Sequence, residues 1–142
     1  MKVKIKRIDK SLELPTYKTH ESAGFDFFCR ESITIAPRET KIIRANNIIE
    51  APHGYFLAVL ARSSLFFKKG LMLANSMGVV DRDFSGPDDE IGLIMWNPGD
   101  KAVTVDKGER IAQGLFIPVV QAEWDEVDEV RKDSRGGFGS TG

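Results

Sequence analysis

The sequence has one cysteine, no CxxC or HExxH motif, and no apolar run long enough to cross a bilayer. Cys29 therefore has no partner for an internal disulfide, and we expect a small buried thiol. The two histidines, His20 and His53, lie far apart, which argues against a zinc or iron site. No apolar segment of a signal peptide follows the lysines of "MKVKIKRIDK". These absences predict a soluble, cytoplasmic protein.

An excess of charge is also absent. The 20 lysines and arginines are balanced by 21 acidic residues, which gives a formal net charge of −1. Without a broad basic field, we expect neither nucleic acid nor a membrane as a partner. A small phosphate ligand needs only a few local cations and is compatible with this balance. The 142 residues, 42% of them hydrophobic, suit a single domain with a real core and no second domain.

What the sequence does contain is a series of short apolar runs separated by turn residues. Repeated short strands at this spacing predict an all-β sandwich or barrel. Two runs, "GYFLAVLA" and "GLIMWN", are continuous rather than alternating, which predicts burial on both faces. The runs are VKIKRI, SITIAP, KIIRANNIIEAP, GYFLAVLA, GLIMWN, KAVTVDKG and RIAQGLFIPVV.

One short helix is expected, over residues 65–69, with Ser63 or Ser64 as its cap and Gly70 closing it. Later in the chain, "AEWDEVDEV" spaces Trp124, Val127 and Val130 like the face of a helix. The same segment is equally compatible with the end of a strand followed by a solvated linker.

Five stretches carry polar residues that could bind a ligand or take part in catalysis. In "ARSSLFFKKGL", free N–H groups at the helix start lie next to Arg62, which suits an anion, although an ordinary capped turn looks the same. In "NSMGVVDRDFSG", a hairpin would place Asp81 and Asp83 on one side of a strand. An ionised carboxylate there can deprotonate a water, and it can equally cap a turn.

The other three stretches are also ambiguous when each is taken alone. "AGFDFF" places Asp26 in an apolar run, where an acid is either satisfied by backbone or part of a site. "KGERIAQGLF" carries Arg110 and Gln113, which an exposed strand edge would also explain. "SRGGFGSTG" combines Arg135 with glycines whose N–H groups can form an anion nest, although terminal glycines often fray.

Taken in order, the series AGFDF, ARSSLFFKKGL, GVVDRDFSG, GERIAQ and RGGFGSTG resembles the five motifs of the trimeric dUTP diphosphatases (dUTPases), from about Ala23 to the last residue. The resemblance implies a jelly-roll-like β-barrel or sandwich that forms a homotrimer with shared active sites. It also implies a barrel domain over residues 1–132 and a mobile glycine-rich arm over 133–142 that closes over the site. The implied reaction is hydrolysis of dUTP to dUMP and pyrophosphate, which limits uracil in DNA and supplies dUMP for thymidylate synthesis.

The resemblance also implies roles for individual residues. Asp81 matches the catalytic aspartate that orients and deprotonates water, and Asp26 matches the acid that reaches Mg²⁺ through water. Phosphate-binding roles are implied for Arg62, Ser63, Ser64 and Gln113. Recognition of the uracil and the deoxyribose is implied for Asn75, Gly78, Val79, Val80 and Phe84. Arg135, Phe138 and Gly139 match the arm, with Phe138 covering the base.

Three features depart from the pattern of the family. Phe84 stands where the family usually has tyrosine, which removes a phenol but keeps a ring for the deoxyribose. Asp133 stands at the position of the usual arm arginine, and Arg135 follows two residues later. The stretch "SGPDDEIGL" is a few residues longer than the usual link after the third motif.

Three alternatives stay open. The related dCTP deaminases share the fold and use a glutamate, for which Glu90 is a candidate, but they lack the glycine-rich arm. A nucleotide-sensing or partner-binding protein would keep the fold without turnover. A nucleic-acid-binding β-barrel would need a basic face, which the charge balance disfavours.

Overall fold

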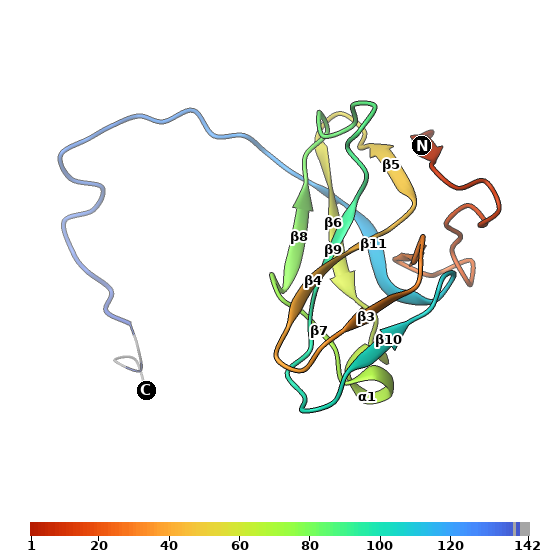
Figure 1. Cartoon of the computed structure of the whole chain (residues 1–142). Coiled ribbons are helices and arrows are strands. Elements are labelled where there is room, and N and C mark those ends of the chain that lie inside the picture. The colour runs from red at the N-terminus through yellow and green to blue at the C-terminus, as the bar shows by residue number, and fades with distance from the viewer. Residues whose placement is uncertain (138, 140–142) are drawn as a thin grey trace.

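The computed structural model of the chain describes residues 1–137 and 139 (Figure 1). Within these residues, the chain forms eleven β-strands and one short helix, which confirms the prediction of an all-β fold with a single short helix. In chain order the elements are β1 (Lys4–Arg7), β2 (Phe25–Phe28), β3 (Ile33–Ile35), β4 (Thr40–Arg44), β5 (Asn47–Glu50), β6 (Tyr55–Ala61), α1 (Leu65–Lys69), β7 (Met72–Leu73), β8 (Met77–Val80), β9 (Gly92–Trp96), β10 (Val103–Val105) and β11 (Arg110–Pro118).

The strands pair in an antiparallel manner in four sheets. The largest has the order β2-β11-β6-β8, and a second has the order β4-β9-β7. Two-stranded sheets β1-β5 and β10-β3 complete the body. One hydrophobic core joins the two larger sheets, with Phe27 and Leu57 from the first packed together with Ile43 and Leu93 from the second.

The two continuous apolar runs behave differently. In β6, three successive residues, Leu57, Ala58 and Val59, are all buried, as predicted for a strand covered on both faces. In β9, burial alternates instead: Leu93 and Met95 face the core, whereas Trp96 is exposed. The prediction for β9 was wrong because this strand lies between β4 and β7 in a sheet whose outer face is only partly covered.

Gly114 in β11 allows two aromatic rings to lie directly on the strand. A Cβ atom at this position would come within 2.7 Å of Phe25 and 2.9 Å of Phe27. Those two rings are buried and pack edge to face at 5.3 Å, so they have little room to move.

We therefore expect Gly114→Ala to lower the free energy of unfolding by about 1–3 kcal/mol, as overpacked cores do. Thermal unfolding followed by circular dichroism measures this change. Gly137→Ala is the control, because a Cβ there meets no atom within 4 Å. Equal melting temperatures for the two variants would contradict the packing argument.

Cys29 is buried, as the sequence analysis predicted. Burial, together with the nearby carboxylate of Glu109, raises the pKa of the Cys29 thiol to about 12. The thiol is therefore protonated and covered at neutral pH.

The chain from residue 119 to residue 137 forms neither helix nor strand and extends away from the body (Figure 1). The helical interpretation of "AEWDEVDEV" was therefore wrong. Val120, Trp124 and Val130 are each at least 87% exposed on this segment. Within the described residues, no helix is long and apolar enough to span a membrane.

Candidate active site

Asp26 is the best-anchored acidic residue among the predicted site residues. It lies in β2 between Phe25 and Phe27, which point into the core, so its own side chain points to the opposite face of the sheet. Its side chain is only 11% exposed, and each carboxylate oxygen meets one arginine. Oδ1 lies 2.9 Å from Nε of Arg62, and Oδ2 lies 3.3 Å from Nη1 of Arg110.

A β-bulge in β11 brings Arg110 to this carboxylate. In the β2–β11 register, Gln113 lies opposite Asp26 and Ala112 opposite Phe27, but Arg110 rather than Ile111 lies opposite Phe28. The extra residue, Ile111, is buried. Arg110 therefore shares the face of Asp26, since residues directly opposite in a sheet share a face.

Gln113 lies on the same face and is held by the backbone of β6. Its Nε2 donates to the carbonyl of Ala61 at 3.0 Å. Gly24 leaves room for the other end of the amide, because a Cβ atom at Gly24 would lie 2.9 Å from Oε1 of Gln113.

The turn after β6 places Arg62, Ser63 and Ser64 beside this cluster. The helix spans Leu65–Lys69 and ends at Gly70, which has a positive φ of 68°, both as predicted, and the buried Leu65 anchors its start. Ser64 occupies the N-cap position but makes no side-chain cap hydrogen bond. Its hydroxyl is thus available to another partner, and Ser63 is exposed.

The second group of predicted site residues lies just before, within and just after β8. Asn75 precedes this strand, Gly78, Val79 and Val80 belong to it, and Asp81 follows it. In the sheet order, β8 pairs with β6 and is an edge strand. The expectation of a hairpin here was wrong, because β7 pairs with β9 and β8 pairs with β6.

Asp81 and Arg62 lie beyond opposite ends of the β6–β8 pairing. Leu57 is opposite Val80, and Leu60 is opposite Met77. At about 3.4 Å per residue, Arg62 and Asp81 are separated by roughly 15–20 Å along the strands. One chain therefore brings Asp26, Arg62, Ser63, Ser64 and Gln113 together but leaves Asp81 away from them.

Asp81 begins a turn rather than continuing the strand. The N–H of Phe84 donates to the carbonyl of Asp81 at 3.2 Å. The alternation expected to place Asp81 and Asp83 on one side does not apply, because β8 ends at Val80. Asp81 and Phe84 are both exposed, and the carboxylate of Asp81 has no hydrogen bond or ion pair with any described residue.

This turn and the long stretch after it are tied to the N-terminal sheet, the latter through the carbonyl of Pro87, which accepts from Nζ of Lys6 at 3.4 Å. Arg82 pairs with Glu50 at 2.6 Å, and Glu50 also pairs with Lys4 in β1. The carboxylate of Asp89 accepts from the N–H of Gly86 at 2.7 Å, which closes the tip as a turn.

The carboxylate of Glu90 is held by contacts that stabilise the fold. Its Oε1 accepts from Nε of Arg30 at 2.8 Å and from the backbone N–H of Asn46 at 3.0 Å. These contacts occupy the residue on which the deaminase alternative depends.

Of the predicted arm residues, Arg135 and Gly139 are described, and neither makes a hydrogen bond or ion pair with the other described site residues. Arg135 is exposed, and Gly136 and Gly139 have positive φ values of 78° and 90°, which glycine adopts without strain. Phe138 lies outside the described residues.

Three or more potential metal ligands do not come together anywhere in residues 1–137 and 139. Asp26 is the one buried acid of the cluster, and two guanidinium groups already occupy its oxygens. This donor set does not form a protein cage for a metal. It is compatible with a metal held mainly by substrate phosphates and water, which is how Mg²⁺ is commonly bound.

The ion pair between Asp26 and Arg110 was not predicted from the sequence. The two residues are 84 positions apart, and the bulge that joins them has no evident sequence signal. The nearest signal was the presence of a single acid in an apolar run, which required a partner from elsewhere in the chain.

Comparisons with known proteins show which family this chain resembles. The family model of dUTPase matches residues 10–142. The deoxyuridine 5'-triphosphate nucleotidohydrolase of Nautilia profundicola is 42% identical over 144 residues, covering 100% of this chain and 99% of that protein. The corresponding protein of Helicobacter pylori is 39% identical and covers 100% and 97%.

Two solved structures share the fold. The dUTPase of Streptococcus mutans superposes with a TM-score of 0.78 at 30% identity, covering 84% of this chain and 98% of that one. The dUTPase of Staphylococcus bacteriophage 80alpha with dUPNHPP has a TM-score of 0.86 at 24% identity, covering 99% and 98%, and this likeness concerns the fold alone. The jelly-roll-like architecture expected from the sequence is thereby confirmed, and the chain belongs to the dUTPase family.

Proposed function

We propose that this protein hydrolyses dUTP to dUMP and pyrophosphate. The observation that carries the proposal is the turn at Arg62–Ser64, which offers a guanidinium and two uncommitted hydroxyls on one surface of the sheet. A polyanionic ligand is the natural partner of such a group of donors. The nucleotidohydrolases at about 40% identity over the full length support dUTP as that ligand.

In the proposed mechanism, water attacks the α-phosphorus and Asp81 takes its proton. Asp81 is exposed and carries no ion pair within the described chain, so its carboxylate is free to accept a hydrogen bond from water. Arg62, Ser63 and Ser64 hold the phosphates, and Gln113 contributes its amide next to them. Catalysis then depends mainly on positioning and on stabilisation of negative charge.

Uracil would be recognised along β8. As an edge strand, β8 presents backbone N–H and C=O groups that its sheet does not use. Gly78 and the backbone at Val79 and Val80 pair with the edge of the base, and Asn75 contributes its amide. Cytosine would leave some of these groups unpaired, which is costly in a covered site. Phe84 lies beneath the deoxyribose and excludes a 2′-hydroxyl sterically.

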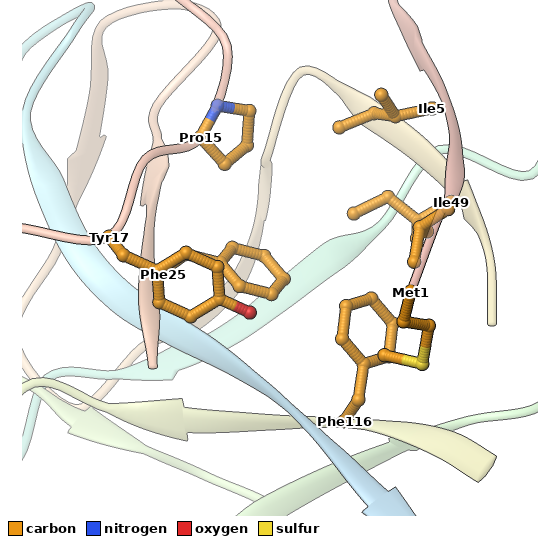
Figure 2. Close-up of a pocket in the computed structure, with 8 residues that line it drawn as sticks. Met1, Ile5, Pro15, Tyr17, Phe25, Ile49 and Phe116 are labelled. Carbon is orange, nitrogen blue, oxygen red and sulfur yellow. The ribbon is translucent and has the colours of Figure 1, made fainter. Parts of the chain in front are cut away.

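The active protein is proposed to be a homotrimer whose sites are shared between subunits. The separation of Asp81 from Arg62 supports this, because one chain does not assemble both halves of the site. The exposed valines and Trp124 after β11 provide apolar surface for contact with another copy. So does a pocket of about 230 Å³ formed by Met1, Ile5, Tyr17 and Phe116 with their neighbours (Figure 2).

That pocket is not the nucleotide site in this proposal. Phe25 lies in its wall (Figure 2), on the core side of β2. Asp26, the next residue of the strand, points to the opposite face. No lysine, arginine or serine lines the pocket, and its side chains are mainly apolar, which does not suit a triphosphate.

The dUTPase family uses a divalent metal ion, and we propose Mg²⁺ as that ion for this protein. Bound to the phosphates, it would neutralise their charge during the reaction. Asp26 would reach it through water rather than directly, since both of its oxygens are engaged by arginines. We further propose a cytoplasmic setting, which suits the free thiol of Cys29. There the activity would limit uracil in DNA and supply dUMP for thymidylate synthesis. The proposal includes no nucleic-acid or membrane partner.

The proposed arm comprises residues 133–142, and the barrel domain comprises residues 1–132. Arg135 would contact the γ-phosphate in place of the family's arginine, Gly139 would let the backbone wrap the phosphates, and Phe138 would cover the base. Closure of this arm would exclude water from the site.

The direct test is pyrophosphate release from dUTP, dCTP, dTTP and UTP in parallel, first with Mg²⁺ and then with EDTA. We expect release from dUTP alone, and only with the metal. Binding of dUTP without release from any nucleotide would favour the sensing alternative instead.

Phe84→Ala should admit UTP, because the 2′-hydroxyl would no longer meet the ring. The ratio of kcat/KM for dUTP to that for UTP is expected to fall about tenfold or more, the scale of a lost steric contact. Phe84→Tyr is the matched control and should keep the ratio. An unchanged ratio in the alanine variant would show that Phe84 does not discriminate the sugar.

A further inference from the structure

The bulge in β11 brings a second arginine to the carboxylate that pairs with Arg62, and the function proposed above gives that arginine no role. We propose that Arg110 is a positioning residue of the phosphate site. Its side chain holds Asp26 and its carbonyl holds Arg62, so that the guanidinium of Arg62 is fixed toward the substrate phosphates. This inference rests on the proposed function and extends it.

The contacts of Arg62 define its orientation. Nε lies 2.9 Å from Oδ1 of Asp26 in an ion pair, and Nη1 donates to the carbonyl of Arg110 at 3.0 Å. Nη2 has no hydrogen bond within the described part of the chain. The guanidinium therefore keeps the N–H groups of Nη2, which a phosphate oxygen can accept.

Arg110 contributes to that orientation twice. Its Nη1 lies 3.3 Å from Oδ2 of Asp26, which leaves Oδ1 as the oxygen for Arg62. Its carbonyl fixes a second nitrogen of the same guanidinium. Both contacts depend on the bulge, because a regular β11 would place Ile111 at this register position.

The charges of the cluster favour an anion. Two guanidinium groups and one carboxylate leave one net positive charge beside the serines. Without Arg110, the pair of Asp26 and Arg62 would be neutral, and one oxygen of a nearly buried carboxylate would lose its partner.

A purely structural role for Arg110 predicts a different outcome. The side chains of Arg110 and Arg62 are 35% and 31% exposed. The carboxylate between them is only 11% exposed, but water can take the place of Arg110 at its Oδ2, so the loss of this ion pair should cost little folding stability. A loss confined to phosphate binding is therefore the result that distinguishes positioning from folding.

The experiment uses Arg110→Gln, Arg110→Lys and the control Arg44→Gln, which changes an exposed arginine in the other sheet. Calorimetry measures binding of a non-hydrolysable imido analogue of dUTP and of deoxyuridine, which has no phosphate. For Arg110→Gln, we expect analogue binding to weaken about tenfold to a hundredfold, the range of a charge-assisted hydrogen bond. Deoxyuridine binding and the melting temperature should stay as in the parent, and lysine should restore only part of the loss.

A double-mutant cycle with Arg62→Gln tests whether Arg110 acts through Arg62. If it does, adding Arg110→Gln to Arg62→Gln should weaken analogue binding by less than about twofold more. Additive losses would overturn the proposal. So would a glutamine variant that fails to fold or loses deoxyuridine binding equally, a variant that matches Arg44→Gln, or full rescue by lysine.

The same measurements separate this inference from the proposed function. A parent protein that binds the analogue but does not hydrolyse dUTP contradicts the proposed function, while the binding comparison still tests Arg110. A parent protein that does not bind the analogue contradicts both.

Discussion

Asp81→Asn is expected to reduce pyrophosphate release from dUTP by about a hundredfold to ten-thousandfold, the contribution of a positioned general base. Asparagine has the same shape as aspartate but does not accept the proton of the attacking water. Asp81 is exposed and has no ion pair within the described chain, so the change should not disturb the fold. Steady-state kinetics with Mg²⁺ measures the loss.

Nucleotide binding provides the control for this variant. Calorimetric binding of the imido analogue should be nearly unchanged, because Asp81 acts on water rather than on the nucleotide. Asp83→Asn, two positions later in the same exposed turn, should retain full activity. Equal turnover by Asp81→Asn and the parent would remove Asp81 from the mechanism.

Deletion of residues 134–142 is expected to leave a folded homotrimer with little activity. Strand β11 ends at Pro118, and none of the described residues of the tail belongs to the core, so we expect folding not to depend on the deleted segment. Activity should fall because the phosphates and the base lose their cover. Circular dichroism, light scattering and dUTP hydrolysis together measure the three properties.

A longer deletion, of residues 119–142, is the comparison for the shorter one. It also removes the exposed Val120, Trp124 and Val130, which we propose as contact surface for another subunit. We expect this variant to lose assembly as well as activity. An unfolded or monomeric product from the shorter deletion would show instead that the tail is structural.

Much of the fold was predictable because burial and turns follow local sequence. The helix at Leu65–Lys69 begins after two serines and ends at Gly70, where a left-handed residue is required. Burial of β9 was mispredicted, because the same apolar run suits a strand covered on one face or on two. Pairing of β8 with β6 across α1 and β7 depends on long-range register, which local patterns do not contain.

The candidate site was predictable in its parts and less so in its arrangement. Asp26 stood out as an acid in an apolar run, but its partners come from the turn after β6 and from a bulge in β11. The distance between Asp81 and Arg62 follows from strand register and was not visible in the order of the motifs. Which motifs come together within one chain is therefore information that the structure adds to the sequence.

The buried state of Cys29 has a practical consequence for following the tail in solution. Since the only native thiol is covered and protonated at neutral pH, a maleimide dye should find no site on the folded parent protein. A Gly137→Cys variant would then carry the dye at a single place, with no need to remove the native cysteine. Changes in its fluorescence anisotropy on addition of nucleotide would report the motion of the tail in real time.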